Sequence, residues 1–486
     1  MVRDEGGGQF VTVTLVGGFP SGLAHITTMP DLTESDNDTD SVTASTPLAT
    51  SVLEWLLIPL SDAGFPLPCV KRVVALVSGL LVASSARRGD LATALAGLHL
   101  SAAKPESIAR RIARLLDDPR CDPQRLLPAI FTTELLTTLL TGEIAAHAAN
   151  ARSGASHHER FRPLHLVVDL STKNEQVVIL AVGLAYRGLV VPLAVRTWPH
   201  NAPLPEGTYW QNLLSALSEV SAHLPPVLRD HVILVADRAF GVPRMVDAAN
   251  AFGWAWVLRV QGQVRVRFRD GTTQPIRTLA AHPGAVWFSG FGQATLADES
   301  LPSDAVAVFK DARWRSCQVI AVWDEAAAEP WLLITNLPAS REQVAAYAHR
   351  WAIERLFLSW KSHGWDLEGL QLRTPERVGR LAAALALATL WCLQTGAAHA
   401  DILLADLEDR ATRRAAAVFQ PRLRGLSPTP PDHRPYSAHF SLLTWGRKVI
   451  EQTPCRTKTP ARRHDLPYWQ APIWSLHCTQ IMELIA

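Results

Sequence analysis

The chain lacks several features that would assign it to a protein class at once. Its 47 Lys and Arg residues are nearly balanced by 45 Asp and Glu residues, so the formal net charge is only +2. So small a charge does not identify a polyanion-binding protein, and any contact with nucleic acid must come from local clusters of basic residues. Overall composition therefore neither identifies nor excludes a DNA-binding protein.

Cysteine is scarce, and no two cysteines stand in a Cys-x-x-Cys spacing. This scatter argues against a zinc site and against a disulfide framework, and it favours a reducing, cytoplasmic compartment. The six residues are Cys69, Cys121, Cys317, Cys392, Cys455 and Cys478.

Long apolar runs are also missing. The longest, residues 381–393, is shorter than the roughly 20 residues that a membrane-crossing helix requires. We therefore expect a buried helix there and no membrane partner.

Changes in composition and periodicity divide the 486 residues. Residues 1–50 are rich in Gly, Ser, Thr and Asp, and we expect them to be disordered. We expect a helical DNA-binding domain over 51–155 and an α/β catalytic domain over 156–375, which contains a β-rich insertion at about 254–337. Residues 376–486 are expected to form a C-terminal helix and tail that could serve in dimerisation.

A basic helix is predicted in the N-terminal region, from Pro105 onward. Its apolar residues repeat at helical spacing, and the arginines fall on the other side. These arginines could contact DNA phosphates, although a merely solvated basic face is the more frequent explanation for such a pattern taken alone. They are Arg110, Arg111 and Arg114.

Two apolar strands are each predicted to end in an aspartate. Residues 164–168 precede Asp169, and residues 232–236 precede Asp237 and Arg238. Polar groups at strand ends of a mixed sheet are where sites form, although a single such aspartate is more often a turn or cap residue.

The β-rich segment begins with a strict alternation that ends at an Asp-Gly turn. The alternation places Arg265, Arg267 and Arg269 on one face of a hairpin and apolar side chains on the other. A basic ribbon beside tryptophans could follow a phosphate backbone and stack bases. The alternative, that each tryptophan fills the β-core, is the more frequent one for any single residue.

A helix is predicted over residues 341–362, with chemistry on one face. At about 100° per residue, Tyr347, Arg350, Glu354 and Lys361 fall within an arc of about 60°. Arg350 and Lys361 could hold DNA phosphates, as could Arg238, and Tyr347 could donate to a phosphate. Glu354 could be only an ion-pair partner of Arg350 at i−4. Glu354 can instead complete a metal site together with Asp169 and Asp237. Such a site of hard carboxylate ligands is what phosphodiester chemistry with Mg²⁺ requires.

The spacing Tyr347-x-x-Arg350-x-x-x-Glu354-x-x-x-x-x-x-Lys361 resembles the Tyr-Arg-Glu-Lys signature of bacterial DDE transposases of the insertion-sequence-four family. The likeness extends over about 160–375. It implies a ribonuclease H-like core with an inserted β-domain, a helical N-terminal DNA-binding domain and a homodimer assembled on the double-stranded DNA of transposon ends and target, at the nucleoid.

The same resemblance assigns roles to residues. It implies that Asp169, Asp237 and Glu354 bind Mg²⁺, with Mn²⁺ as an alternative, and that cleavage at the element ends is followed by strand transfer. It also implies that Trp331, with Trp323 as the weaker match, stacks on a base flipped out of the DNA. Leu358 stands where some relatives have a lysine. A related nuclease that cuts without joining, and a catalytically silent DNA-binding derivative, are the alternative functions.

Overall fold

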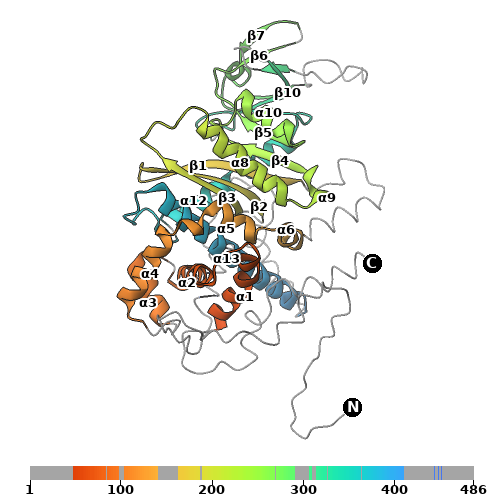
Figure 1. Ribbon diagram of the computed structural model, residues 1–486. Coiled ribbons are helices and arrows are strands. Elements are labelled where there is room, and N and C mark those ends of the chain that lie inside the picture. Colours follow the sequence, from red (N-terminus) through yellow and green to blue (C-terminus); the bar gives the residue numbers. More distant parts are fainter. Residues whose placement is uncertain are drawn as a thin grey trace.

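The computed structural model of the chain is a mixed α/β protein built around one large sheet (Figure 1). It describes residues 47–83, 85–97, 103–140, 163–186, 189–268, 270–289, 306–308, 314–325, 327–362 and 364–409, together with 443, 447 and 450. Disorder was predicted for residues 1–50; this is wrong for residues 47–50, which begin a helix, and residues 1–46 lie outside the described part. Arg269 and most of the C-terminal tail also lie outside it.

Helices precede the first strand. They are α1 (Pro47–Asp62), α2 (Leu67–Ala83), α3 (Arg88–Gly97), α4 (Pro105–Asp117), the 3₁₀ turn η2 (Pro119–Cys121), α5 (Pro123–Ile130) and α6 (Thr133–Leu139). Helix α4 confirms the predicted pattern, because its apolar residues from Ile108 to Leu116 are buried while Arg110 and Arg114 are exposed. Pro105 at the first helical position has no N–H group, so one of the donors that a helix start leaves without an intrahelical partner is absent.

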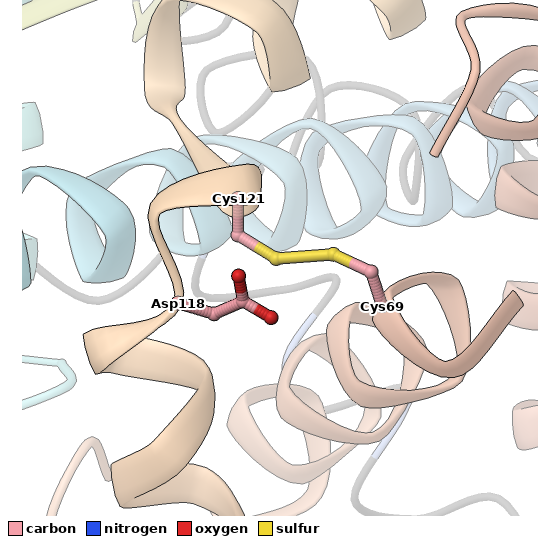
Figure 2. A group of neighbouring side chains, drawn as sticks. All are labelled: Cys69, Asp118 and Cys121. Atoms are coloured by element: carbon pink, nitrogen blue, oxygen red, sulfur yellow. A yellow bond between two sulfur atoms is a disulfide. The ribbon is translucent and has the colours of Figure 1, made fainter. Parts of the chain in front are cut away.

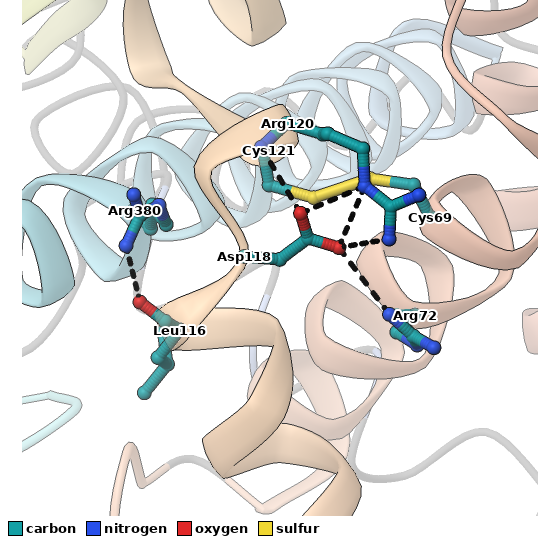
Figure 3. Close-up of a disulfide and its surroundings, with 7 residues drawn as sticks. All are labelled: Cys69, Arg72, Leu116, Asp118, Arg120, Cys121 and Arg380. Carbon is teal, nitrogen blue, oxygen red and sulfur yellow. Dashed lines mark hydrogen bonds and ion pairs between the residues drawn. A yellow bond between two sulfur atoms is a disulfide. The ribbon is translucent and has the colours of Figure 1, made fainter.

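A disulfide joins α2 to η2 through Cys69 and Cys121, which are 52 residues apart in sequence. Figure 2 shows the carboxylate of Asp118 beside the two sulfur atoms. In Figure 3 this carboxylate accepts hydrogen bonds from Arg120 at 2.8 Å and from Arg72 at 3.3 Å. Scattered cysteine spacing therefore did not exclude a disulfide, because spacing does not report which helices pack together.

The central part of the sheet is formed by five strands. These and the helices between them are β1 (Leu164–Lys173), β2 (Val177–Tyr186), β3 (Leu189–Pro199), α8 (Thr208–His223), α9 (Pro226–Arg229), β4 (Val232–Ala236), α10 (Pro243–Ala251) and β5 (Ala255–Arg259). The strand order is β3-β2-β1-β4-β5, with antiparallel pairing from β3 to β1 and parallel pairing from β1 to β5. This mixed sheet is consistent with the expected ribonuclease H-like core.

The sheet continues beyond β5 through further strands. They are β6 (Arg265–Arg267), β7 (Thr273–Pro275), β8 (Val286–Phe288), β9 (Val306–Val308), β10 (Arg315–Val322) and β11 (Trp331–Thr335), with the turn η3 (Ile276–Leu279). Strand β11 pairs directly with β5. The segment 254–337 thus starts with β5 of the central part and ends with β11, which pairs with β5, while β6 and β7 lie at the end of the molecule opposite to α1–α4 (Figure 1).

Two short helices occupy the region where one helix was predicted. They are α11 (Arg341–Ala348) and α12 (Trp351–Lys361), and the prediction of a continuous helix over 341–362 is wrong. The long helix α13 (Pro375–Asp409) follows and packs against β3 and α2. Its stretch Pro375–Thr395 is long and apolar enough to cross a membrane, but 83 % of its most apolar part is buried inside the protein, which confirms the predicted buried helix.

The two faces of β4 bury different side chains. Leu234 and Ala236 belong to the main core, whereas Ile233 and Val235 belong to a smaller cluster that also contains Tyr347. This division follows from the two-residue period of a strand. Helix α11 covers the second face and so brings the residues that follow it to the edge of β1 and β4.

Candidate active site of three carboxylates

The parallel ladder between β1 and β4 ends at the pair Val168 and Ala236. Asp169 and Asp237 are the next residues on the two strands, so their backbones start from neighbouring strands about 4.8 Å apart. Asp237 ends its strand as predicted, but β1 continues to Lys173 because β2 pairs with it to that point. The prediction that Asp169 ends a strand is therefore wrong, and it is the parallel ladder alone that ends there.

The junction between α11 and α12 lies against β1. His349, in this junction, stacks its ring on that of His165 at a centroid distance of 4.1 Å. Burial, together with the neighbouring His349, lowers the pKa of His165 to about 3, so the pair is neutral and packs as two aromatic rings. Arg350 follows directly, and the stacked pair thus fixes where its side chain leaves the backbone.

Arg350 links two of the three carboxylates. Its guanidinium donates to Asp169 at 3.2 Å, and its other terminal nitrogen donates to Glu354, one turn further along α12. The arginine side chain is only 9 % exposed, whereas that of Glu354 is 39 % exposed. The ion pair of Arg350 with Glu354 that sequence spacing allowed is therefore present, and it is shared with Asp169.

The carboxylate of Asp169 is the most perturbed acid of the site. Burial raises its pKa to about 6, while Arg350 and a hydrogen bond of 2.8 Å from the backbone N–H of Leu170 oppose the shift. The charges of Asp237 and Glu354 raise the pKa further, so all three carboxylates lie within electrostatic reach of one another. A carboxyl group perturbed in this way by burial and by like charges is typical of a functional site.

The donor set of these carboxylates suits a hard divalent cation. Mg²⁺ takes oxygen ligands and retains part of its water shell, so a few carboxylates suffice. Within the described residues, however, the only group of three ligands with donor atoms within 4.8 Å of one another is Cys69, Asp118 and Cys121. The acids around Arg350 are spaced more widely, with its guanidinium between two of them.

The cysteine-containing group does not suit a metal. Its two sulfur atoms are bonded to each other, and the oxygens of Asp118 already accept hydrogen bonds from Arg72 and Arg120. No thiolate remains as a ligand. The three-carboxylate site is therefore the better candidate for a cation.

Tyr347 lies beneath the site instead of on a displayed face. It is 1 % exposed, and its ring meets that of Trp331 edge-on at 4.9 Å. Burial raises the pKa of Tyr347, while Arg350 and Arg259 oppose the shift. The prediction of one exposed face is wrong here because the helix breaks after Ala348, which separates Tyr347 from the α12 face.

The cations predicted to contact DNA from the core are engaged with glutamates. Arg238 pairs with Glu329 at 3.1 Å, and Lys361 pairs with Glu368 at 3.1 Å. Spacing could not reveal the partner of Arg238, since Glu329 lies 91 residues away along the chain. Trp331, two residues after that glutamate, is half-buried at the start of β11.

The arginines of the hairpin behave differently from each other. Arg265 is half-buried and donates to the backbone carbonyl of Thr273 at 3.0 Å, whereas Arg267 is exposed and lies over the ring of Trp314 at 4.5 Å. Val266 between them is buried, which confirms the predicted alternation. Arg111 in α4 is half-buried, while its two neighbouring arginines are exposed.

Several residues near the carboxylates were missed by sequence reasoning. Arg259 ends β5 and pairs with Glu329 at 2.7 Å, and Tyr209 at the start of α8 has its pKa raised to about 12 by burial and by the charge of Asp237. Trp351 is 44 % exposed and lies against the guanidinium of Arg350 at 5.2 Å. Of these residues, only Trp351 could have been proposed from the sequence, because it directly follows the signature arginine Arg350.

Comparison with known proteins gives one informative result. Residues 141–391 match the family described as the transposase DDE domain, and this range contains Asp169, Asp237 and Glu354. No curated protein matches the chain significantly. Transposases act on DNA, and those of this type generally depend on divalent metal ions. Because the match covers more than half of the 486 residues, the chain belongs to the transposase DDE domain family.

Proposed function

We propose that the protein is a cut-and-paste transposase of the insertion-sequence-four type that cleaves DNA at the ends of its element and joins those ends to a target. The observation that carries the proposal is the convergence of Asp169, Asp237 and Glu354 from two neighbouring strands and a helix. The membership of the chain in the transposase DDE domain family supports the assignment as a transposase. The signature residues Tyr347 and Arg350, which lie at the same site, support the finer assignment.

The three carboxylates are proposed to hold Mg²⁺, with Mn²⁺ as an alternative. When bound, such ions activate an attacking oxygen and stabilise the leaving one in phosphodiester chemistry. Asp169 supplies a rigid ligand, because it is buried and its backbone lies within a sheet. Glu354 supplies a more adaptable one, because it is partly exposed at the start of α12. Arg350 keeps the two acids together and balances their charge.

The DNA would extend from the core toward other basic residues. We propose that Arg238, Lys361 and Trp331 contact the element end and that the hairpin arginines follow its backbone. The helices α1–α6, with the arginines of α4, would form the N-terminal DNA-binding domain, and β6 to β10 the inserted β-domain. A homodimer on the DNA, in the cytoplasm at the nucleoid, completes the proposal.

A cleavage and joining assay tests this function. Purified protein would be incubated with labelled DNA carrying the ends that flank its gene, a target plasmid and Mg²⁺. Asp237→Asn is expected to abolish both cleavage and joining, whereas Asp230→Asn, an exposed aspartate two residues before the same strand, should leave both unchanged. Cleavage without joining would favour the nuclease alternative, and an unaffected Asp237→Asn variant would refute the assigned site.

A further inference from the structure

One carboxylate joins two arginines beside the site. Glu329 pairs through one oxygen with Arg259 at 2.7 Å and through the other with Arg238 at 3.1 Å. Arg238 directly follows the acid Asp237, and Arg259 ends the adjacent strand β5. A single glutamate thus holds two cations that come from neighbouring strands of the central sheet.

The surroundings of this pair suit an anion with more than one oxygen. Tyr347 lies beside Arg259, whose guanidinium can only donate to the hydroxyl oxygen, and the buried O–H group itself donates to no acceptor within the described part of the chain. The neutral hydroxyl of Tyr347 therefore lies next to the guanidinium groups with its proton available to a bound anion. Arginine forks and a hydroxyl together match the oxygens of a phosphate group.

We propose that Glu329 occupies a phosphate subsite in the DNA-free protein and that a backbone phosphate of DNA displaces it. The inference rests on the proposed function, because it takes DNA as the ligand. Arg238, Arg259 and the hydroxyl of Tyr347 form the subsite, and the carboxylate of Glu329 stands in for the phosphate until DNA arrives.

The contacts on the two sides of the ion pair make this exchange feasible. Glu329 lies in a bend before β11, and its side chain is 53 % exposed, so it can turn into solvent. Arg259 is only 13 % exposed and also donates to the backbone carbonyl of Pro330 at 3.1 Å, so its position does not depend on the glutamate alone. The pair of Arg238 with Glu329 is exposed on both sides, and such a pair is weak and is readily replaced by a better anion.

The exchange gives Glu329 a role in setting DNA affinity. After displacement its negative charge remains close to the bound phosphate and weakens the complex. Two cations and one anion then act on the DNA roughly as a single net charge. Removal of the carboxylate charge would raise the net positive charge at the subsite to two. Each additional neutralised phosphate makes the slope of log K for DNA binding against log salt concentration steeper by about 0.9.

Binding of a short fluorescein-labelled DNA duplex, measured by anisotropy without divalent metal over a range of salt concentrations, tests the proposal. Glu329→Gln keeps the shape and a hydrogen-bond acceptor but removes the charge. It should bind several-fold more tightly than wild type at moderate salt, with a salt slope steeper by about one. Glu325→Gln is the matched control, since it removes the same charge from an exposed residue of the same turn region. It should change neither quantity appreciably.

A second variant shows whether the arginine is the cause. Arg238→Ala in the Glu329→Gln background should remove most of the gain in affinity. Equal affinities of Glu329→Gln and wild type, or equal gains from Glu329→Gln and Glu325→Gln, would overturn the inference, as would weaker binding by a Glu329→Gln protein whose Tm is unchanged. Failure of the wild type itself to bind the duplex would instead refute the proposed function, so the two failures are distinguishable.

Discussion

Arg350 donates a hydrogen bond of 3.2 Å to Asp169, which lies 181 residues earlier in the chain. The same guanidinium holds Glu354 on its own helix. One buried cation therefore fixes the relative position of a strand carboxylate and a helix carboxylate. Because the arginine opposes the effect of burial on Asp169, its removal should have a measurable effect on titration as well as on geometry.

The variant Arg350→Met is expected to shift the pH dependence of DNA cleavage. Without the guanidinium, the pKa of Asp169 should rise above about 6, because Arg350 is the strongest of the influences that lower it. The pH of half-maximal cleavage should therefore move upward, in addition to a loss of rate. Arg341→Met, at the exposed start of α11, is the control and should leave the profile unchanged.

The variant Asp169→Asn is expected to stabilise the metal-free protein at neutral pH while it abolishes cleavage. The folded pKa of about 6 lies above the ordinary value of 3.8, so the folded state binds more protons between these values, and stability falls as pH rises through about 6. Removal of the charge should gain on the order of 1 to 3 kcal/mol above that pH. Thermal unfolding with a chelator present would measure it, and a gain of equal size at pH 3.5 would contradict the explanation.

Gly241 permits a close approach between the loop after Asp237 and the end of β5. A Cβ atom at this position would lie 2.1 Å from the carbonyl oxygen of Arg259, so the backbone would have to move. Gly241→Ala is expected to destabilise the protein by about 1 to 3 kcal/mol and to reduce cleavage. Gly89→Ala, where a Cβ would meet no atom within 4 Å, provides the control in the same unfolding and cleavage measurements.

The disulfide between Cys69 and Cys121 should contribute to the stability of the N-terminal helices. Closing a loop over a separation of 52 residues restricts the unfolded chain, which is typically worth about 2 to 4 kcal/mol. Reduction with dithiothreitol should lower the Tm of the wild type but not that of Cys69→Ser. Equal sensitivity of both proteins to the reductant would show that another cause is responsible.

Trp331 offers a test of the stacking role. Its ring packs against Tyr347, so Trp331→Phe should keep that contact and most of the stability, whereas Trp331→Ala loses both packing and stacking. If the ring also holds a flipped base, Trp331→Ala should impair second-strand cleavage more than first-strand nicking. Gel analysis of the two products would measure this, and equal losses in both steps would leave only a packing role.

Local patterns in the sequence were sufficient for much of the fold. Alternation predicted the arginines that flank the buried Val266, and helical spacing predicted the buried face of α4, because these features depend on neighbours close in the chain. The signature spacing likewise placed Arg350 one turn before Glu354. Helical spacing did not predict the break after Ala348, which lies where the ring of His349 meets that of His165 on β1, a contact between residues far apart in the chain.

The sequence by itself determined which residue types the site contains: three acids, a signature arginine and several further cations. Only the tertiary structure decided their partners. The sheet register placed Asp169 beside Asp237, and folding brought Glu329 to the arginines beside them. Charge pairing over such separations depends on distances in space, which the order of residues along a chain does not specify.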